Sequence, residues 1–151
     1  MKVRRIHVTA QTPAGAAAIY GLLADGSSWP RWSPIESVSL EQPGDPRPEG
    51  VGAVRALGRG RIVGRDQILD LVPGRRFAYA SRSGLPVRDY VGEVDLADDP
   101  GGGTTIHWRA SFSPKVPGTG WLLERGITRF LDECAHGLAA YSAASSDADA
   151  A

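Results

Sequence analysis

The sequence has little cysteine, little lysine and no long apolar run, and each scarcity excludes a class of protein. Its single cysteine excludes a disulfide framework and a thiolate metal site. No segment approaches the roughly 18 consecutive apolar residues of a membrane-spanning helix, so none is expected. The 17 basic residues are balanced by 17 acidic ones. This balance argues against nucleic acid as a partner, because such affinity comes from an excess of Lys and Arg that neutralises phosphates.

Length and composition indicate a single domain. The chain has 151 residues, of which 42% are hydrophobic, enough for a core that needs no disulfides. The hydrophobic periodicity lies within residues 1–141, and residues 142–151, made of Ala, Ser and Asp, are expected to form a disordered tail. Residues 1–7 are not followed by an apolar block, so no secretory signal is expected and a cytoplasmic location is predicted. The sequence leaves open whether the protein is a monomer or a homodimer.

Hydropathy periodicity predicts a strand, a helix, a short bend, six further strands and a long final helix. Thr12 and Pro13 suit the start of the first helix, and Asp25 followed by Gly26 suits its end. The final helix carries an apolar stripe at spacings of three and four residues. The predicted strands are 3–10, 35–42, 51–57, 61–72, 77–83, 87–97 and 104–113, and the predicted helices are 14–24 and 117–141.

The last hairpins can be aligned because residues opposite each other in an antiparallel pair share a face of the sheet. The alignment that starts from Arg82 opposite Val87 gathers aromatic residues on the inner face and opposite charges on the outer one. The predicted pairs are Phe77–Gly92, Tyr79–Tyr90, Ser81–Arg88, Arg76–Glu93, Val94–Trp108, Leu96–Ile106, Glu93–Arg109 and Asp95–His107. The inner face is then apolar except for two tyrosines, one serine and Arg88.

The inward face of the strand 61–72 depends on the length of the turn at Pro73 and Gly74, and the sequence leaves two phases open. One phase turns Asp66, Ile68 and Asp70 inward. The other turns Arg65, Gln67, Leu69 and Leu71 inward. The difference matters because an inward carboxylate is a candidate base whose pKa is shifted unless it is paired.

Three segments resemble a known superfamily. They are Trp29 to Pro34 after the first helix, Pro73 to Tyr79, and Gly103 to Trp108. With the order of elements, they resemble the START-like or Bet v 1-like (SRPBCC) superfamily and, within it, the bacterial polyketide cyclase/dehydrase group. The resemblance implies an α+β helix-grip fold, in which a curved antiparallel sheet of about seven strands wraps around a long C-terminal helix and encloses a ligand cavity. Members share no short catalytic motif, so no catalytic residue is transferred by it.

Candidate site residues come from the predicted inner face and from the ends of the cavity. Arg88 could stabilise an enolate oxygen, and Tyr79 or Tyr90 could donate a proton or a hydrogen bond. The competing interpretation places Arg88 at a strand end with its charge in water. Candidate ligand-binding residues are Phe77, Ser81, Trp108, Phe112, Trp121, Arg125 and Trp32, although Trp32 also suits a core position and Trp121 and Arg125 a solvated helix turn.

The leading functional hypothesis is a cavity for a small hydrophobic molecule, aromatic or polyketide-like, with cofactor-free cyclisation and dehydration as its chemistry. The alternative is a non-catalytic carrier or sensor of a lipid, quinone or similar apolar ligand. A third class is an interaction module that uses the basic middle strands. Three scattered histidines do not supply the convergent ligands of a zinc site, so no metal and no cofactor is predicted.

Overall fold

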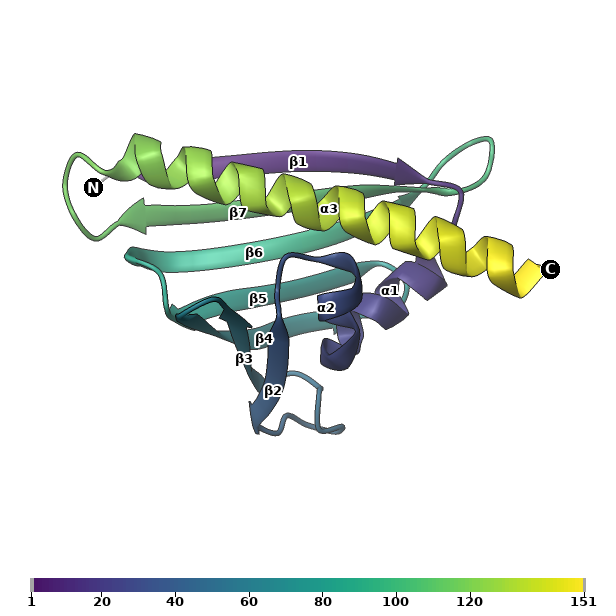
Figure 1. Cartoon of the computed structure of the whole chain (residues 1–151), viewed down its shortest axis with the longest axis horizontal. Coiled ribbons are helices and arrows are strands. Elements are labelled where there is room, and N and C mark those ends of the chain that lie inside the picture. Colours follow the sequence, from purple (N-terminus) through teal and green to yellow (C-terminus); the bar gives the residue numbers. More distant parts are fainter. Residues whose placement is uncertain (1, 151) are drawn as a thin grey trace.

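Seven antiparallel strands form one curved sheet in the order β1-β7-β6-β5-β4-β3-β2 (Figure 1). The computed structural model describes the backbone of residues 2–150 and the side chains of residues 2–145. The strands are β1 (Arg4–Thr12), β2 (Ser37–Gln42), β3 (Val54–Arg59), β4 (Ile62–Val72), β5 (Arg76–Ser83), β6 (Val87–Asp98) and β7 (Thr104–Pro114). Each corresponds to a predicted strand. The helix-grip prediction is therefore confirmed.

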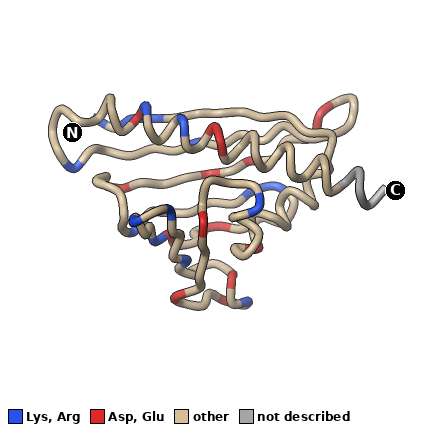
Figure 2. The backbone as a smooth tube through the Cα atoms, in the orientation of Figure 1, with Lys and Arg blue, Asp and Glu red and all other residues tan. Residues whose placement is uncertain are grey.

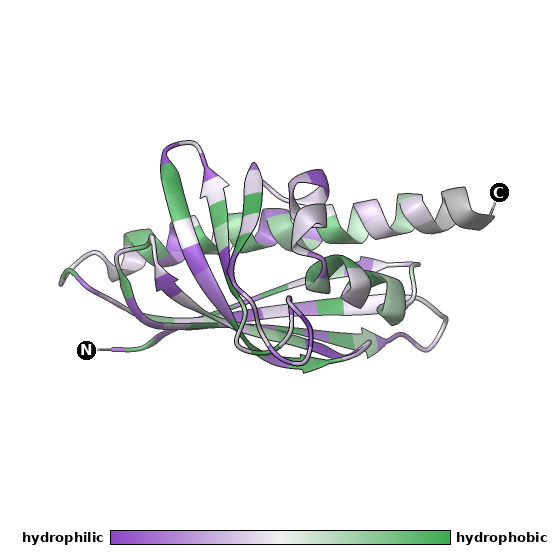
Figure 3. Cartoon of the chain, turned by 90° about the horizontal axis from the view of Figure 1, so that it is seen from below, coloured by the Kyte–Doolittle hydropathy of each residue, from purple (hydrophilic) through white to green (hydrophobic). Residues whose placement is uncertain are grey.

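The helices lie on one side of this sheet (Figures 1 and 3). They are α1 (Ala16–Ala24), the 3-10 turn η1 (Gly26–Ser28), the single turn α2 (Trp29–Trp32) and α3 (Gly120–Ala150). A Cβ atom at Gly137 of α3 would overlap the backbone carbonyl of Trp32, so the absence of a side chain there lets α2 rest directly on α3. In the described part of the chain, no helix has both the length and the apolar character that crossing a membrane requires.

The final helix is longer than the sequence predicted. The backbone remains helical beyond Tyr141, to Ala150, and Ser142 is 1% exposed with its hydroxyl donating to Leu138 O at 2.6 Å. The expected disordered tail at 142–151 is thus wrong for the backbone as far as residue 150, while residue 151 lies outside the described residues. Apolar periodicity is lost beyond Tyr141, but alanine has the highest helix propensity and extends a helix without it.

Thr12 has a different role from the predicted one. It is the last residue of β1, and α1 is preceded by Gly15, which makes no side-chain capping bond. The Thr12 hydroxyl instead donates to Ala139 O in α3 at 2.9 Å and accepts from the Ala14 amide. This buried residue therefore joins the first strand to the last helix.

Strand β7 alternates between buried and half-buried residues along its whole length, and Figure 3 shows the corresponding alternation of hydrophobic and hydrophilic positions in the sheet. Its predicted alignment with β6 is confirmed, because Val94 lies opposite Trp108 and Leu96 opposite Ile106. All four side chains are at most 5% exposed. They form the inner face against which the helices pack.

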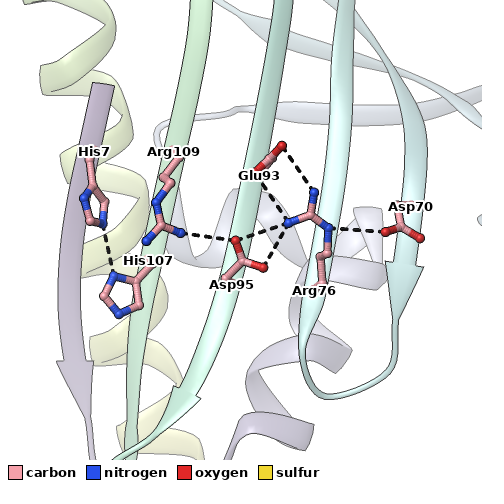
Figure 4. Close-up of polar contacts among 7 residues, drawn as sticks. All are labelled: His7, Asp70, Arg76, Glu93, Asp95, His107 and Arg109. Carbon is pink, nitrogen blue, oxygen red and sulfur yellow. Dashed lines mark hydrogen bonds and ion pairs between the residues drawn. The ribbon is translucent and has the colours of Figure 1, made fainter. Parts of the chain in front are cut away.

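The outer face carries a row of ion pairs across four strands (Figure 4). Arg76 of β5 contacts carboxylates on both neighbouring strands, with Asp70 at 3.2 Å, Glu93 at 3.2 Å and Asp95 at 3.1 Å. Arg109 of β7 contacts Asp95 at 3.2 Å. These side chains are half-buried or exposed, so each pair stabilises the fold by less than about 1 kcal/mol. Their main effect is to keep this face of the sheet in water.

The alignment of β5 with β6 differs from the predicted one by two residues. Tyr79 lies opposite Gly92 rather than Tyr90, and Phe77 lies opposite Val94. A shift of two leaves every side chain on its predicted face. A bulge between Arg88 and Val91 adds one unpaired residue to β6. The side chains on the far side of this bulge therefore change face, and Arg88 lies opposite Ser113 on the outer face, exposed to solvent.

Strand β4 follows the first of the two open phases only for part of its length. Asp66 and Ile68 face inward, opposite Ser81 and Tyr79 of β5. A bulge between Ile68 and Asp70 then reverses the phase, so Asp70 turns outward to Arg76 and Leu71 pairs with Phe77. The sheet thus presents one carboxylate from this strand, Asp66, to its inner side.

The absence of a side chain at Gly92 makes room for the ring of Tyr79. A Cβ atom at residue 92 would overlap that ring, whereas nothing lies within 4 Å of a Cβ atom at Gly101 in the β6–β7 turn. We expect Gly92→Val to displace Tyr79 and to lower the free energy of unfolding by roughly 1–3 kcal/mol, the usual cost of overpacking. Urea denaturation measures this effect, with Gly101→Val as the control. Equal stability of the two variants would contradict the observed alignment.

Candidate functional site

A pocket lies between the inner face of the sheet and α3, with a volume of about 330 Å³. Its wall is mainly apolar and comes from β3, β4, β5, β6, β7, α2 and the first half of α3. Its opening is bordered by exposed apolar residues of the β3–β4 turn, the β5–β6 turn and the start of α3. The lining residues are Trp29, Ile35, Leu57, Arg59, Ile62, Gly64, Asp66, Tyr79, Ser81, Ser83, Gly84, Leu85, Tyr90, Trp108, Leu122, Leu123, Gly126, Ile127 and Phe130.

Aromatic rings form the innermost part of this wall and hold one another in place. Trp108 is fully buried, and its indole N–H donates to Tyr79 Oη at 3.1 Å. The Trp29 ring meets Trp108 edge-on with centroids 6.0 Å apart, and Tyr90 stacks on Phe112 at 6.1 Å. Packed aromatic pairs of this geometry contribute about 0.5–1.5 kcal/mol each beyond the apolar area that they bury. The two tyrosine hydroxyls are therefore held in fixed positions at the pocket wall.

Asp66 is the acidic residue of the pocket lining. Its side chain is half-buried because it faces the pocket space, while protein surrounds it on the other sides. Among residues 2–145 we find no hydrogen-bond donor and no ion-pair partner for its carboxylate. Burial raises the pKa of Asp66 to about 7, and the nearby charge of Arg55 opposes that rise. The carboxyl group can thus gain or lose a proton near neutral pH.

The Arg55 guanidinium lies opposite Asp66 in the sheet but is engaged elsewhere. It donates to Leu23 O at 3.0 Å and to Ala24 O, and it contacts Glu49 at 3.1 Å. These two carbonyls belong to the last turn of α1, where a positive charge is favourable. Arg55 therefore anchors a helix, and its charge reaches Asp66 without a direct ion pair.

The tyrosines can donate hydrogen bonds at any ordinary pH. Burial raises the pKa of Tyr79 and that of Tyr90 well above the usual value, with a further contribution from the charge of Asp66. Tyr79 Oη accepts the Trp108 N–H, and a hydrogen bond between Tyr79 and Tyr90 opposes the rise in the pKa of Tyr90. The pocket thus brings together one titratable carboxyl and two neutral phenols on an apolar wall, an arrangement suited to proton transfer or to orienting a polar group of a ligand.

Four of the residues proposed from the sequence lie in the pocket wall, namely Tyr79, Tyr90, Ser81 and Trp108. They come from β5, β6 and β7, and their inward positions follow from the alternation of those strands. The structure brings these four together with Asp66, which the sequence analysis had left between two phases.

Three others lie in the core behind the wall. Phe77 is 2% exposed and packs against Trp29, and Phe112 supports Tyr90 from behind. Trp32 is buried with its indole N–H donating to Ser28 Oγ at 3.1 Å, which supports the core interpretation for that residue. These positions correct the expected ligand contacts, because each ring is covered by a neighbour that lines the pocket.

The remaining three are outside the pocket, and their proposed roles are corrected. Arg88 is on the outer face because of the bulge in β6, which leaves no inner cation at that position. Trp121 is 59% exposed and Arg125 is also exposed, both on the side of α3 that faces away from the wall. Their neighbours Leu122 and Gly126 line the opening instead. Figure 2 shows Lys and Arg residues gathered at this end of the molecule, around the start of α3.

Several apolar residues of the pocket wall are not among the predicted site residues. Leu123, Ile127 and Phe130 belong to the predicted apolar stripe of the last helix, so a signal for them existed. Ile62 and Leu85 sit next to turns, where an apolar residue gives no sign of whether it borders a cavity. Only the spatial approach of those turns to α3 makes them part of the opening.

The structure shows no convergent metal ligands in the part of the chain that it describes, where no group of three His, Cys, Asp or Glu residues is suitably placed. On the outer face, His7 Nε2 lies 3.0 Å from His107 Nδ1, at the end of the row of ion pairs in Figure 4. Burial, with a smaller contribution from the charge of Arg109, lowers the pKa of His7. Cys134 is fully buried, and burial raises the pKa of its thiol.

Comparison with known proteins agrees with the resemblance seen in the sequence. The family described as polyketide cyclase/dehydrase and lipid transport matches residues 4–143. No curated protein matches the sequence.

Several solved structures share the fold. The Zhui aromatase/cyclase from Streptomyces sp. R1128 has a TM-score of 0.78 at 18% identity, over 93% of this chain and 94% of that one. A START superfamily protein from Mycobacterium smegmatis has a TM-score of 0.77 at 15% identity, over 91% and 96%. Ara h 8.0201 has a TM-score of 0.75 at 15% identity, over 93% and 98%.

The raised pKa of Asp66 predicts that stability falls as pH rises. Its folded pKa of about 7 lies above the value of 3.8 for an unperturbed Asp, so the folded state holds the proton more tightly than the unfolded state between these values. The native protein loses stability across that range, and Asp66→Asn, which cannot ionise, does not. We expect the variant to be more stable than wild type at pH 8 by roughly 1–4 kcal/mol and closer to it at pH 5.

Urea denaturation at the two pH values measures this difference. Asp70→Asn is the matched control, because Asp70 lies on the same strand but on the outer face with its side chain 52% exposed. A stability difference between Asp66→Asn and wild type that is the same at pH 5 and pH 8 would show that Asp66 is not desolvated.

Proposed function

The chain belongs to the polyketide cyclase/dehydrase and lipid transport family, and from this premise we propose that its pocket binds a small, flat, mostly apolar molecule of the aromatic or polyketide type. The observation that supports this most directly is the apolar wall around about 330 Å³ of space. Pockets for small molecules usually enclose about 300–1,000 Å³ and have a few polar groups that fix the ligand's orientation. Here those groups are Asp66, Tyr79, Tyr90 and Ser81.

The shape of the wall favours a flat ligand. Trp29, Trp108 and Tyr79 present ring faces or edges to the pocket, and Ile127 and Phe130 of α3 lie on the opposite side. A planar molecule between aromatic and aliphatic walls buries apolar area on both faces, at about 25 cal/mol for each Å². An extended flexible chain would lose more conformational entropy on entering the same space.

A variant that fills the opening tests the binding proposal. Gly126 lines the pocket, and nothing lies within 4 Å of a Cβ atom at this position, so the helix has room for a side chain there and Gly126→Phe adds a ring at the opening. We expect the neutral fluorescent probe N-phenyl-1-naphthylamine to bind wild type and to bind Gly126→Phe at least tenfold more weakly. Fluorescence titration gives both affinities, and native mass spectrometry reports any molecule that wild type retains on purification.

Gly21→Phe is the matched control, because Gly21 is also a helical glycine with free space around it but lies outside the pocket. It is expected to bind the probe like wild type. If wild type does not bind the probe, or if Gly21→Phe weakens binding as much as Gly126→Phe does, the binding proposal is wrong.

Cofactor-free proton-transfer chemistry is the second candidate function, and the unpaired carboxyl of Asp66 is the observation that favours it. The Asp66 carboxylate would remove a proton from the carbon next to a ligand carbonyl, while Tyr79 or Tyr90 donates a hydrogen bond to the developing enolate oxygen. In a dehydration, the carboxylic acid returns that proton to the departing hydroxyl group. The products are an unsaturated carbonyl compound and water, with no oxidant or reductant consumed. Arg88 has no part in this scheme.

Deuterium exchange separates this chemistry from simple carriage. In heavy water at pH 8, wild type should accelerate exchange of the methyl protons of 2-acetylnaphthalene by roughly 10²-fold or more, the usual range for a general base. Asp66→Asn should lose that acceleration, because an amide cannot accept the proton. Proton NMR follows the exchange. Exchange at the rate of the solvent reaction, together with measurable binding of the ketone, would indicate a carrier.

A further inference from the structure

We propose that the pocket selects its ligand by charge, accepting a flat apolar molecule whose inner end carries a protonated amine, with Asp66 as the counter-ion, and rejecting an anion at that position. This inference rests on the proposed binding function and names the ligand chemistry of the same site. The positions of the charged residues relative to the pocket support it.

Asp66 lies away from the opening of the pocket. It lies four residues along β4 from Ile62 at the opening, a distance of about 13 Å in an extended strand. Ser81 of β5 lies opposite it on the inner face, and Tyr79, opposite Ile68, is its diagonal neighbour. A ligand that fills the pocket therefore places one end among Asp66 and these hydroxyl groups and leaves the other end near the opening.

No cation on the described part of the chain forms an ion pair with the Asp66 carboxylate. Arg55 is engaged by two carbonyl oxygens of α1 and by Glu49. Arg88 is on the outer face. Arg59 lines the pocket only at the opening, where its guanidinium lies 5.6 Å from the centre of the Phe130 ring. The inner end thus has a negative group that lacks a donor, and a ligand N–H or ammonium would supply one.

The charge of the pocket depends on pH through Asp66. Besides Asp66, the titratable and charged groups on the elements around the pocket are Arg55 beside it on β3, Arg59 at the opening, Tyr79 of β5, Tyr90 of β6 and, next to the two tyrosines, Cys134 of α3. Burial raises the pKa of Tyr79, of Tyr90 and of Cys134, so these three stay neutral near pH 7. Asp66, with its pKa raised to about 7, changes charge between pH 6 and pH 8.

The sign of the pH effect follows from which form of Asp66 the ligand needs. An alkylammonium ion stays charged throughout this range and requires the carboxylate, so its binding strengthens as pH rises and Asp66 loses its proton. The carboxylate fraction grows about tenfold from pH 6 to pH 8, which sets the maximal gain in affinity. An anionic ligand shows the opposite trend because the carboxylate repels it.

Three probes of one shape test this inference. They are 2-(aminomethyl)naphthalene, a cation; 2-naphthalenemethanol, neutral; and 2-naphthoate, an anion. Isothermal titration calorimetry at pH 6 and pH 8 gives their affinities for wild type. At pH 8 we expect the amine to bind at least tenfold more tightly than the alcohol and the alcohol more tightly than the naphthoate. Between pH 6 and pH 8 the affinity for the amine should rise by up to about tenfold, while that for the alcohol should stay constant.

Asp66→Asn should lose both the preference for the amine and its pH dependence while still binding the alcohol, and Asp70→Asn, on the outer face of the same strand, should behave as wild type does. Binding of the alcohol without a preference for the amine, or a preference that survives in Asp66→Asn, overturns the charge inference and leaves the pocket intact. Failure of wild type to bind N-phenyl-1-naphthylamine instead overturns the binding function itself, and the charge inference with it.

Discussion

The inner face of the sheet is mainly apolar from β4 to β7, and water is excluded from it only where a helix or an aromatic ring lies against it. Helix α3 covers β1 and β7 (Figure 1). Helix α1 covers part of β5 and β6, and α2 lies between α3 and β2. Trp108 lies where these covers meet, in contact with Trp29, Trp32 and Tyr79. The space between this cluster and the first half of α3 has no element to fill it. The pocket is thus a consequence of covering a wide curved sheet with one long helix and one short helical segment.

Much of this arrangement could be predicted from the sequence, because a β-strand alternates its side chains between two faces and an antiparallel pair must match them. The alternation along β7 placed Trp108 and Phe112 inward, and the matching of charges placed Glu93 beside Arg109. Even the β5–β6 alignment, wrong by two residues, kept Tyr79 on the correct face. The face of the sheet on which a side chain lies can therefore be predicted more reliably than the residue opposite it, since an alignment error of two residues leaves the face unchanged.

Two of the bulges in the sheet, one in β6 and one in β4, decide which side chains reach the pocket, and the sequence could not predict them. A bulge needs one extra residue in a strand, and nearly any residue can occupy it, so it has no fixed sequence mark. In β6 the backbone of Asp89 has a φ of 53°, a left-handed conformation that Asp tolerates better than most residues but does not require. This single inserted residue moved Arg88 to the outer face. In β4 a second bulge kept Asp66 inward and turned Asp70 outward. The C-terminal end of the last helix was missed for a different reason, since alanine extends a helix without tertiary contacts.

Together the bulges determine the charge of the pocket, and with it the kind of chemistry that the wall supports. An inner arginine would polarise a carbonyl group, whereas an inner carboxylate removes protons or holds cations. That carboxylate also lowers the stability of the folded protein above neutral pH, because burial without a partner is unfavourable for a charged group. An asparagine at the same position would fill the same space without that cost. A destabilising, unpaired carboxyl group that faces an otherwise apolar pocket is explained if its partner is the ligand, which replaces the hydrogen bonds that Asp66 lacks in the free protein.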